Sequence, residues 1–421
     1  MDTTDGVYVT AEERRLREAR EGVPWRRWGP YLSERQWGTV REDYSDGGDA
    51  WNYFSHDQAR SRAYRWGEDG LAGVSDDRQR LCFALALWNG ADPILKERLF
   101  GLTNSEGNHG EDVKEYYFYL DNLPSHAYMR WLYKYPQAAF PYLDLLARNR
   151  ERSRYDLEHE LIDTGVFRDN RYFDVEVEYA KAGPEDLVAR ITVHNRGPEA
   201  AAIHLLPTVW FRNTWSWPPH TQRPRLWSER GAVRCEHHRL GGRVLHVEGG
   251  PELLFCENET NARRLWGATN PTPYVKDGIN DRVVAGRLDA VNPEQVGTKA
   301  AAHVRLVVSS GATATIRARL TPEPMEAPFE GCDELIAARR QEADEFYDVI
   351  TPPAVDAERR VVMRQALAGM LWTKQYYDFD VDTWLSEHQA HPFRPPTRSG
   401  VRNERWYHMH NDDIISMPDK W

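Results

Sequence analysis

The chain has 421 residues, of which 41% are hydrophobic and 12% are aromatic. This length exceeds that of one compact core and predicts at least two domains. The formal net charge of −11 argues against nucleic acid as a partner, because contact with the phosphate backbone requires a basic surface.

The N-terminal sequence MDTTDGVYVTAEERRLRE lacks the basic stretch and apolar run of a signal peptide, and the best apolar run, LCFALALW, is only strand-sized. The four cysteines are scattered and form no C-x-x-C pair, which argues against a zinc site or a disulfide framework. We therefore expect a cytoplasmic protein with no membrane partner, no metal and no other cofactor.

A short helix is predicted at the start of the chain, because Thr10 and Glu13 have the spacing of a capping box before EERRLREAR. The region from Trp25 to about Tyr155 is rich in aromatic and charged residues but weakly periodic. This pattern favours strands separated by long, structured loops.

The middle of the chain has the clearest periodicity. Residues 172–180, 187–195 and 201–211 read as three strands separated by the turns KAGPED and RGPE, which predicts an antiparallel meander. The runs RVLHVEG, PELLFCE, DRVVAGRL and AAHVRLVVSSGATATIRARL extend the series of predicted strands to Leu320. The fold class that we predict is therefore mainly β, with a large antiparallel β-sandwich.

The period changes to that of helices at residues 333–350 and 357–380, after a Pro-rich segment at 321–331. The predicted domains are an N-terminal helical extension at 1–27, a β-sandwich at 28–320, a linker with a helix at 321–352, and the start of a helical domain at 353–421.

Three stretches, at 28–45, 51–70 and 101–121, interleave Trp or Tyr with Arg, His, Asn and carboxylates. Sugar sites need this mixture, since flat rings stack on the sugar and polar groups bind its hydroxyls. The same residues would equally serve as ion pairs and hydrogen bonds that support an irregular fold. Glycoside hydrolysis commonly uses two carboxylates, but spacing does not single out a pair among the candidates Glu42, Asp43, Glu68, Asp69, Glu111, Asp112 and Glu115.

Five motifs together resemble the N-terminal part of bacterial glycoside hydrolase family 63 proteins, which are related to processing α-glucosidases and mannosylglycerate hydrolases. They are WGPYLSERQWGTVREDYS, WNYFSHDQARSRAYRWGEDGLAGVSDD, RLCFALALWNG, ILKERLFGLTNSEGNHGEDVKEYYFYLD and NDDIISMPDKW. The resemblance implies an N-terminal β-super-sandwich, a helical linker and a C-terminal (α/α)6 toroid. It also implies hydrolysis of α-glycosidic bonds with inversion, by an acidic general acid and an acidic general base that both lie in the toroid.

Neither of these catalytic carboxylates has a matching position here, so we expect no catalytic residue in this chain and a toroid that is missing or incomplete. The expected partners are an oligosaccharide or glycoside substrate and the missing C-terminal toroid. Because the residues at 357–377 are apolar on more than one side, we expect that helix to have a surface that this chain leaves uncovered.

The substrate-binding candidates fall into two groups. Those nearest to the expected chemistry are Asp412, Asp413, Asp419 and Trp421. Those on loops of the β-domain are Trp37, Arg41, Glu42, Trp51, His56, Arg60, Glu106, His109 and Glu111.

Two other functions stay open. The chain could be a stand-alone carbohydrate-binding β-sandwich, which an exposed groove of aromatic residues on a sheet face would favour and burial of the same residues would oppose. It could instead be a self-sufficient hydrolase that uses carboxylates such as Glu111 and Glu42.

Overall fold

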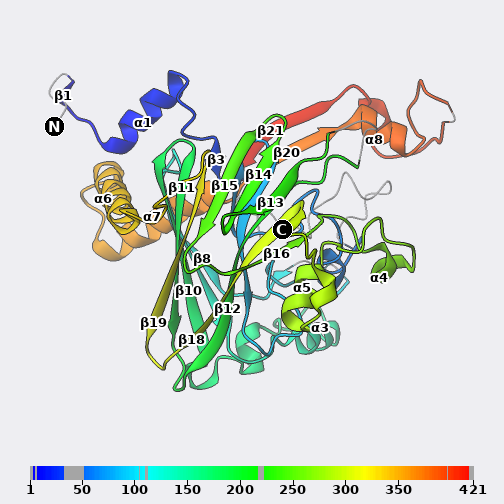
Figure 1. The fold of residues 1–421 in the computed structure, drawn as a ribbon, viewed down its shortest axis with the longest axis horizontal. Coiled ribbons are helices and arrows are strands. Elements are labelled where there is room, and N and C mark those ends of the chain that lie inside the picture. The colour runs from blue at the N-terminus through cyan, green and yellow to red at the C-terminus, as the bar shows by residue number, and fades with distance from the viewer. Residues whose placement is uncertain are drawn as a thin grey trace.

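The computed structural model describes residues 3–4, 7–32, 52–103, 105–109, 112–216, 222–395 and 397–416 (Figure 1). The described chain is mainly β and contains two large sheets in which every paired strand is antiparallel to its neighbour. The prediction of large antiparallel sheets is confirmed.

The larger sheet has nine strands in the order β17-β13-β14-β15-β19-β11-β10-β9-β8. Their bounds are β8 Tyr117–Asn122, β9 Tyr128–Pro136, β10 Tyr172–Gly183, β11 Asp186–Asn195, β13 Arg225–Glu229, β14 Ala232–His237, β15 Gly241–Val247, β17 Val296–Gly297 and β19 Thr313–Thr321. The smaller sheet has six strands in the order β16-β18-β12-β5-β4-β3. Their bounds are β3 Trp28–Gly29, β4 Leu71–Asp76, β5 Leu81–Trp88, β12 Ala201–Phe211, β16 Glu252–Cys256 and β18 Lys299–Val308.

The main hydrophobic core lies between the two sheets. Val175, Val177 and Tyr179 alternate along β10 and belong to the same buried cluster as Phe83 of β5 and Leu205 of β12. Each such side chain contributes roughly 1.5–3 kcal/mol when it leaves water, so the paired inner faces are the main source of stability. This packing is that of a β-sandwich.

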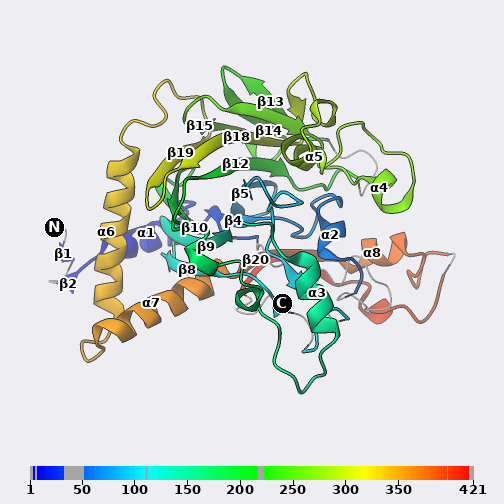
Figure 2. The ribbon, with the colours of Figure 1, turned by 90° about the horizontal axis from the view of Figure 1, so that it is seen from below.

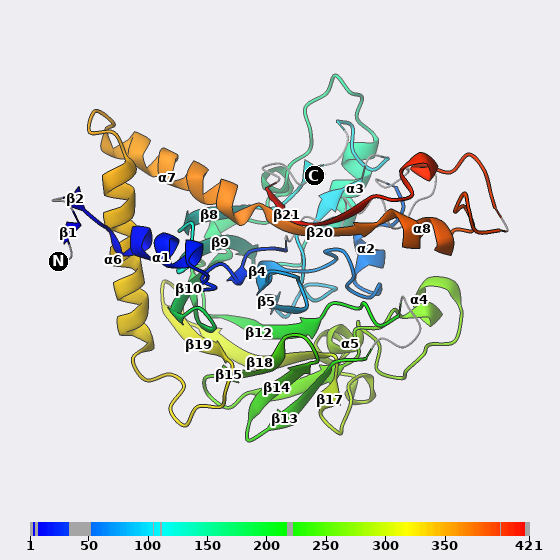
Figure 3. The same ribbon diagram turned by 90° about the horizontal axis from the view of Figure 1, so that it is seen from above.

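Three helices lie at one end of the molecule (Figures 2 and 3): α1 Ala11–Arg20, α6 Cys332–Ile350 and α7 Ala357–Trp372. The predicted capping box of α1 is present, with Thr10 Oγ1 accepting from the backbone N–H of Glu13. Helix α6 packs on the outer face of β9 and β10 through a second buried cluster that includes Ile336 and Ala343. Helix α7 packs on β8, where its Trp372 stacks on Tyr119 with ring centroids 5.7 Å apart.

The remaining described elements are shorter. They are β1 Thr3–Thr4, β2 Val7–Tyr8, α2 His56–Ala59, β6 Gly101–Leu102, β7 Asp112–Val113, α3 Tyr142–Arg150, η2 Leu161–Thr164, η3 Arg168–Asn170, α4 Ala262–Trp266, α5 Gly278–Val284, η4 Leu288–Ala290, β20 Lys374–Asp380, α8 Val381–Glu387, η5 Glu404–Trp406 and β21 His410–Ser416. Strands β20 and β21 pair as an antiparallel ribbon that leads to α8 at the opposite end of the molecule from α6 (Figure 3).

The predicted three-stranded meander is wrong in its third strand. Strand β10 pairs with β11 as expected, but β12 pairs with β18 and β5 in the other sheet. The side chain of Asn195 holds the crossing in place, because its amide donates to the carbonyl oxygens of Glu199 and Val308 at 2.7 and 2.8 Å. The segment RGPE therefore carries the chain between sheets and does not form a hairpin.

Two further predictions of local structure are corrected. The run DRVVAGRL begins inside helix α5 and forms no strand, because Ile279 and Val283, four residues apart, face one buried cluster. The helix predicted for residues 357–380 ends at Trp372, and residues 374–380 form β20. The sequence KQYYDFD suits a strand because it is rich in aromatic residues and its Tyr376 and Phe379 are buried.

In the described part of the chain, no helix is both long enough and apolar enough to cross a membrane. All four cysteines are buried as free thiols.

Candidate functional site

A pocket of about 600 Å³ beside α2 brings together three of the residues that the sequence analysis proposed for substrate binding, His56, Arg60 and Glu106. We call it the aromatic pocket. It is lined by Ser55, His56, Asp57, Arg60, Ala91, Pro93, Ile94, Phe100, Glu106, Ala139, Phe140, Pro141, Tyr142, Leu143, Asp144 and Leu146.

Tyr142, the first residue of α3, is the partly exposed ring of this pocket. Its ring stacks with His56 at a centroid distance of 5.5 Å, meets Phe100 edge to face at 5.0 Å and packs at a tilt against Phe140 at 4.6 Å. Phe100 and Phe140 are only 2% and 3% exposed. The Lys96 Nζ also lies over the tyrosine ring, 4.8 Å from its centroid. His56, Lys96 and the two phenylalanines therefore fix the orientation of the ring, and the part that they leave uncovered forms one wall of the pocket.

The imidazole of His56 supports this wall without carrying charge. Burial, and then the positive charges of Arg98 and Lys96, lower the pKa of His56 well below 6.5. A neutral imidazole stacks on a phenol ring without the desolvation cost of a buried cation. His56 is therefore a supporting residue of the pocket wall.

Charged side chains, among them those of Arg60, Glu106 and Asp144, line the pocket together with the Tyr142 ring. The guanidinium of Arg60 pairs with Asp57 at 3.1 Å. Glu106 accepts from the backbone N–H of Thr103 at 3.0 Å, and Asp144 pairs with Arg148 at 2.7 Å. The hydrogen bond from Arg148, and then His159, lowers the pKa of Asp144, which is therefore ionised at neutral pH. An apolar wall with a few convergent polar groups has the composition of a small-ligand site, and the volume lies within the usual range of about 300–1,000 Å³.

Several carboxylates that the sequence suggested as catalytic candidates are buried and already have partners within the protein. Glu115 pairs with Lys96 at 2.6 Å, and Asp69 pairs with Arg98 at 2.5 Å. Glu68 accepts the backbone N–H groups of three consecutive residues, the nearest at 2.8 Å. All three carboxylates are buried, so they hold the loops beneath the pocket and none of them faces a ligand.

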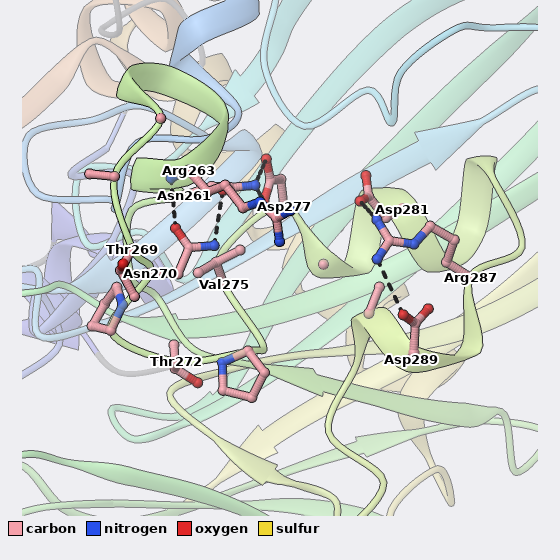
Figure 4. Close-up of a pocket in the computed structure, with 16 residues that line it drawn as sticks. Asn261, Arg263, Thr269, Asn270, Thr272, Val275, Asp277, Asp281, Arg287 and Asp289 are labelled. Atoms are coloured by element: carbon pink, nitrogen blue, oxygen red, sulfur yellow. Dashed lines mark hydrogen bonds and ion pairs between the residues drawn. The ribbon is translucent and has the colours of Figure 1, made fainter.

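A second and larger cavity, of about 810 Å³, lies between α4 and α5 (Figure 4). We call it the loop pocket. Its polar side chains bind one another: Asn261 donates to Asp277 at 3.0 Å, and Arg287 pairs with Asp281 at 3.0 Å. Among its described lining residues there is no aromatic ring. It therefore lacks the stacking surface that a sugar site needs, and several of its polar groups already bind one another.

The two pockets share a polar wall. Arg264 pairs with Asp57, which lines the aromatic pocket, at 2.5 Å, and it also donates to Ser61 at 3.1 Å. The hydroxyl of Ser61 in turn donates to Asp277 of the loop pocket at 2.5 Å. This chain of contacts fixes α2 between the cavities.

The other described candidates lie away from the aromatic pocket. His109 is exposed and contacts Glu158 at 3.1 Å. Asp412 on β21 accepts from Tyr376 at 2.7 Å and pairs with Arg78, and these contacts lower its pKa. Asp413 is exposed. Asp412 therefore ties the β20–β21 ribbon to the turn between β4 and β5.

The remaining candidates lie outside the described residues. They are Trp37, Arg41, Glu42, Trp51, Glu111, Asp419 and Trp421. The hypothesis of a self-sufficient hydrolase, which names Glu111 and Glu42, stays untested for this reason. Within the described residues, no group of three or more His, Cys, Asp or Glu side chains could hold a metal ion.

Sequence reasoning missed Phe140, Tyr142 and Asp144, which the segment FPYLD contributes. Their local pattern is that of an ordinary helix start after a proline. Nothing in it signals that the segment folds against Phe100 and α2, so only the tertiary structure reveals these residues.

Comparison with known proteins found no family model that matches this chain. The uncharacterized protein YMR196W of Saccharomyces cerevisiae is 44% identical over 465 aligned positions, which cover 99% of this chain and 43% of the yeast protein. The chain thus spans less than half the length of this curated relative.

Among solved structures, a putative aldose 1-epimerase from Escherichia coli has a TM-score of 0.24 at 8% identity, covering 49% of this chain and 69% of its own. A putative kojibiose phosphorylase from the human microbiome has a TM-score of 0.21 at 7% identity, covering 51% and 24%. A family GH92 α-mannosidase from Bacteroides thetaiotaomicron has a TM-score of 0.28 at 10% identity, covering 84% and 43%. All three are named as proteins that act on sugars, but scores this low carry no argument about this chain.

Proposed function

We propose that the aromatic pocket binds a sugar ring of an oligosaccharide or glycoside. The chain would then be the N-terminal, substrate-pocket-shaping portion of an inverting α-glycosidase, of the α-glucosidase or mannosylglycerate hydrolase type. The carboxylates that catalyse hydrolysis would lie in a C-terminal toroid. The sequence resemblance to family 63 supports this assignment, and so does the mainly β fold.

The observation that carries the proposal is the convergence of His56, Arg60 and Glu106 on the wall formed by Tyr142. His56 and Arg60 come from one of the stretches whose residue types suit a sugar site, and Glu106 comes from another. The uncovered part of the Tyr142 ring, between an arginine and carboxylates, can make apolar contact with a sugar ring while the charged groups accept and donate hydrogen bonds at the sugar hydroxyls.

A stand-alone carbohydrate-binding sheet has less support. That hypothesis requires aromatic residues exposed on a sheet face. The aromatic residues of β9 include Trp131, Tyr133 and Tyr135, and all three are fully buried in the core of the sandwich.

Titration calorimetry with maltose-type α-glucosides and with mannosylglycerate tests the pocket. Tyr142→Ala removes the ring and should weaken binding about tenfold, as truncation of a central aromatic contact commonly does. Tyr142→Phe is the matched control. It keeps the ring, and the hydroxyl that it removes is buried and has no hydrogen-bond partner among the described groups. Equal affinity of the Ala and Phe variants would refute a contact between the sugar and the Tyr142 ring.

The activity of the chain provides a second test. Because the general acid and base are assigned to the toroid, this chain should bind sugars without hydrolysing them, since each such group typically contributes about 10²–10⁴-fold to the rate. Hydrolysis that persists in the homogeneous protein and disappears in Glu111→Gln would support the self-sufficient hydrolase instead.

The outer face of α7 supports the assignment of a partner domain. Val362 and Met370 are 63% and 46% exposed on the side of α7 that turns away from the buried Ala368 and Trp372. Exposed apolar side chains that gather on one element mark an interaction surface. We assign this face to the proposed toroid.

Binding of this chain to the part of the yeast relative that lies outside the aligned region tests the assignment. Val362→Glu should abolish that binding. Val307→Glu places the same charge on β18, at a position that is 75% exposed, and should leave the binding intact. Loss of binding in both variants, or in neither, would contradict a specific contact through α7.

A further inference from the structure

A third cavity, of about 470 Å³, lies where the end of α1 and the loop after it meet the start of the β20–β21 ribbon. We call it the arginine pocket. Its lining includes the cations Arg20, Arg26, Arg27 and Lys374, and among the described lining residues Asp77 is the single carboxylate. The whole chain carries a net charge of −11, so this concentration of positive charge runs against the overall balance.

Two of these cations have no partner of their own. Arg27 pairs with Glu185 at 2.8 Å, which neutralises it. The guanidinium groups of Arg20 and Arg26, by contrast, make no hydrogen bond or ion pair within the described part of the chain. The nearby carboxylate of Glu18 is already used, because it accepts from the indole of Trp25 at 2.6 Å.

Lys374 is the innermost cation, and His126 fixes its position. The Nε2 atom of His126 lies 3.2 Å from the Lys374 Nζ, and the Nδ1 atom lies 2.9 Å from the amide oxygen of Asn122. This places the imidazole proton on Nδ1 and leaves Nε2 to accept from the ammonium group. Burial, and then the charge of Arg26, lower the pKa of Lys374 to about 8. A bound anion would relieve this repulsion between the two cations.

The rim of the arginine pocket is apolar. Val23 and Ile414 line it and are 37% and 38% exposed. Apolar side chains beside a group of cations suit a ligand with an anionic head and an apolar body. Arginine binds phosphate oxygens through paired N–H groups, and lysine adds a point charge, so a doubly charged phosphate matches this set better than a single carboxylate does.

We propose that the arginine pocket binds a small organic phosphate, a phosphate monoester whose oxygens contact Arg20, Arg26 and Lys374 and whose apolar body lies against Val23 and Ile414. The proposal is independent of the sugar-binding function, because it uses no residue of the aromatic pocket.

Calorimetric titration of the full chain with phenyl phosphate, inorganic phosphate and phenol tests the proposal. Phenyl phosphate should bind saturably, inorganic phosphate more weakly, and phenol not at all. Arg26→Gln should weaken phenyl phosphate binding at least about tenfold, because a charge-assisted contact is lost. Asp77→Asn should tighten binding, since it removes the carboxylate that repels the ligand.

Arg14→Gln is the matched control, because Arg14 is exposed on α1, the helix that carries Arg20, and lies outside the cavity. It removes one positive charge, as Arg26→Gln does, and should leave the affinity unchanged. The proposal is overturned if phenyl phosphate does not bind saturably, if inorganic phosphate binds as tightly, or if Arg14→Gln weakens binding as much as Arg26→Gln.

Discussion

Removal of Lys96 should destabilise the protein far more than removal of a surface lysine. The Lys96 ammonium group and the Glu115 carboxylate are 2.6 Å apart, and both side chains are 0% exposed. Glu115 also accepts from the hydroxyl of Tyr133 at 2.6 Å and from the backbone N–H of Phe100 at 2.9 Å. In Lys96→Met these two neutral donors remain, but the buried negative charge loses its counterion. Such a loss costs about 3–5 kcal/mol of unfolding free energy.

The cost should depend on pH. Burial already raises the pKa of Glu115 in the presence of Lys96, and the loss of the cation raises this pKa further. The folded variant therefore holds a proton that the unfolded chain releases, so its stability falls as the pH rises through the raised pKa. The deficit of Lys96→Met should be larger at pH 8 than at pH 5.5.

Urea unfolding followed by tryptophan fluorescence measures these free energies. Lys134→Met is the control, because Lys134 pairs with Asp174 at a comparable 2.7 Å but is 30% exposed. Asp174 also keeps a second cation, Arg196, at 2.7 Å, so the loss of Lys134 should cost less than about 1 kcal/mol. Combining Lys96→Met with Glu115→Gln removes the uncompensated charge and should recover part of the loss. A cost of Lys96→Met no greater than that of Lys134→Met would refute a stabilising role for the buried pair.

Three further outcomes follow from other parts of the structure. Burial, and then the His204 imidazole 2.8 Å away, lower the pKa of His303 from 6.5 to about 4. The unfolded chain therefore binds this proton at a higher pH than the folded chain does, so the urea midpoint should fall as the pH drops from 6.5 towards 4. The fall should be less steep in His303→Gln. Trp372→Ala should cost about 3–5 kcal/mol in the same assay, because the indole is 2% exposed and donates to the β8 backbone. Asp412→Asn should raise the rate of amide hydrogen exchange in the β20–β21 ribbon and leave that of β10 unchanged, since the ribbon loses a charged contact to the β-sandwich.

The sequence predicted correctly those helices and strands whose formation depends on residues close together in the chain. The Thr10–Glu13 capping box marked the start of α1, and the alternation of residues 172–180 and 187–195 marked β10 and β11. These features depend on neighbours within a few residues, so the sequence alone contains them.

The arrangement of the strands was not predictable in the same way. A strand has the same alternation whichever sheet it joins, so the pattern of β12 could not reveal its partners. Its partners, β5 and β18, are distant in the sequence, and so is the carbonyl oxygen of Val308 to which the Asn195 amide donates at the crossing. Likewise, the residues after Trp372 continue an apolar pattern but become a strand, because β21 is there to pair with them.

The sequence predicted which residue types would line the candidate site, but not which segments would meet there. His56, Arg60 and Glu106 were selected because they stand among aromatic residues, and they line one pocket. The ring that completes the wall, Tyr142, comes from a segment with no such signal. In the same way, Glu115 looked like a catalytic candidate, and its burial against Lys96 is a property of the fold.

Photo-labelling with an α-glucoside that carries a diazirine tests the central claim most directly. After irradiation and digestion with trypsin, the label should lie in the peptide of residues 135–148, which contains Tyr142 and Asp144, and an excess of unmodified glucoside should prevent it. Labelling that is confined to the peptide of residues 265–276, which lines the loop pocket, would contradict the assignment of the aromatic pocket as the sugar site.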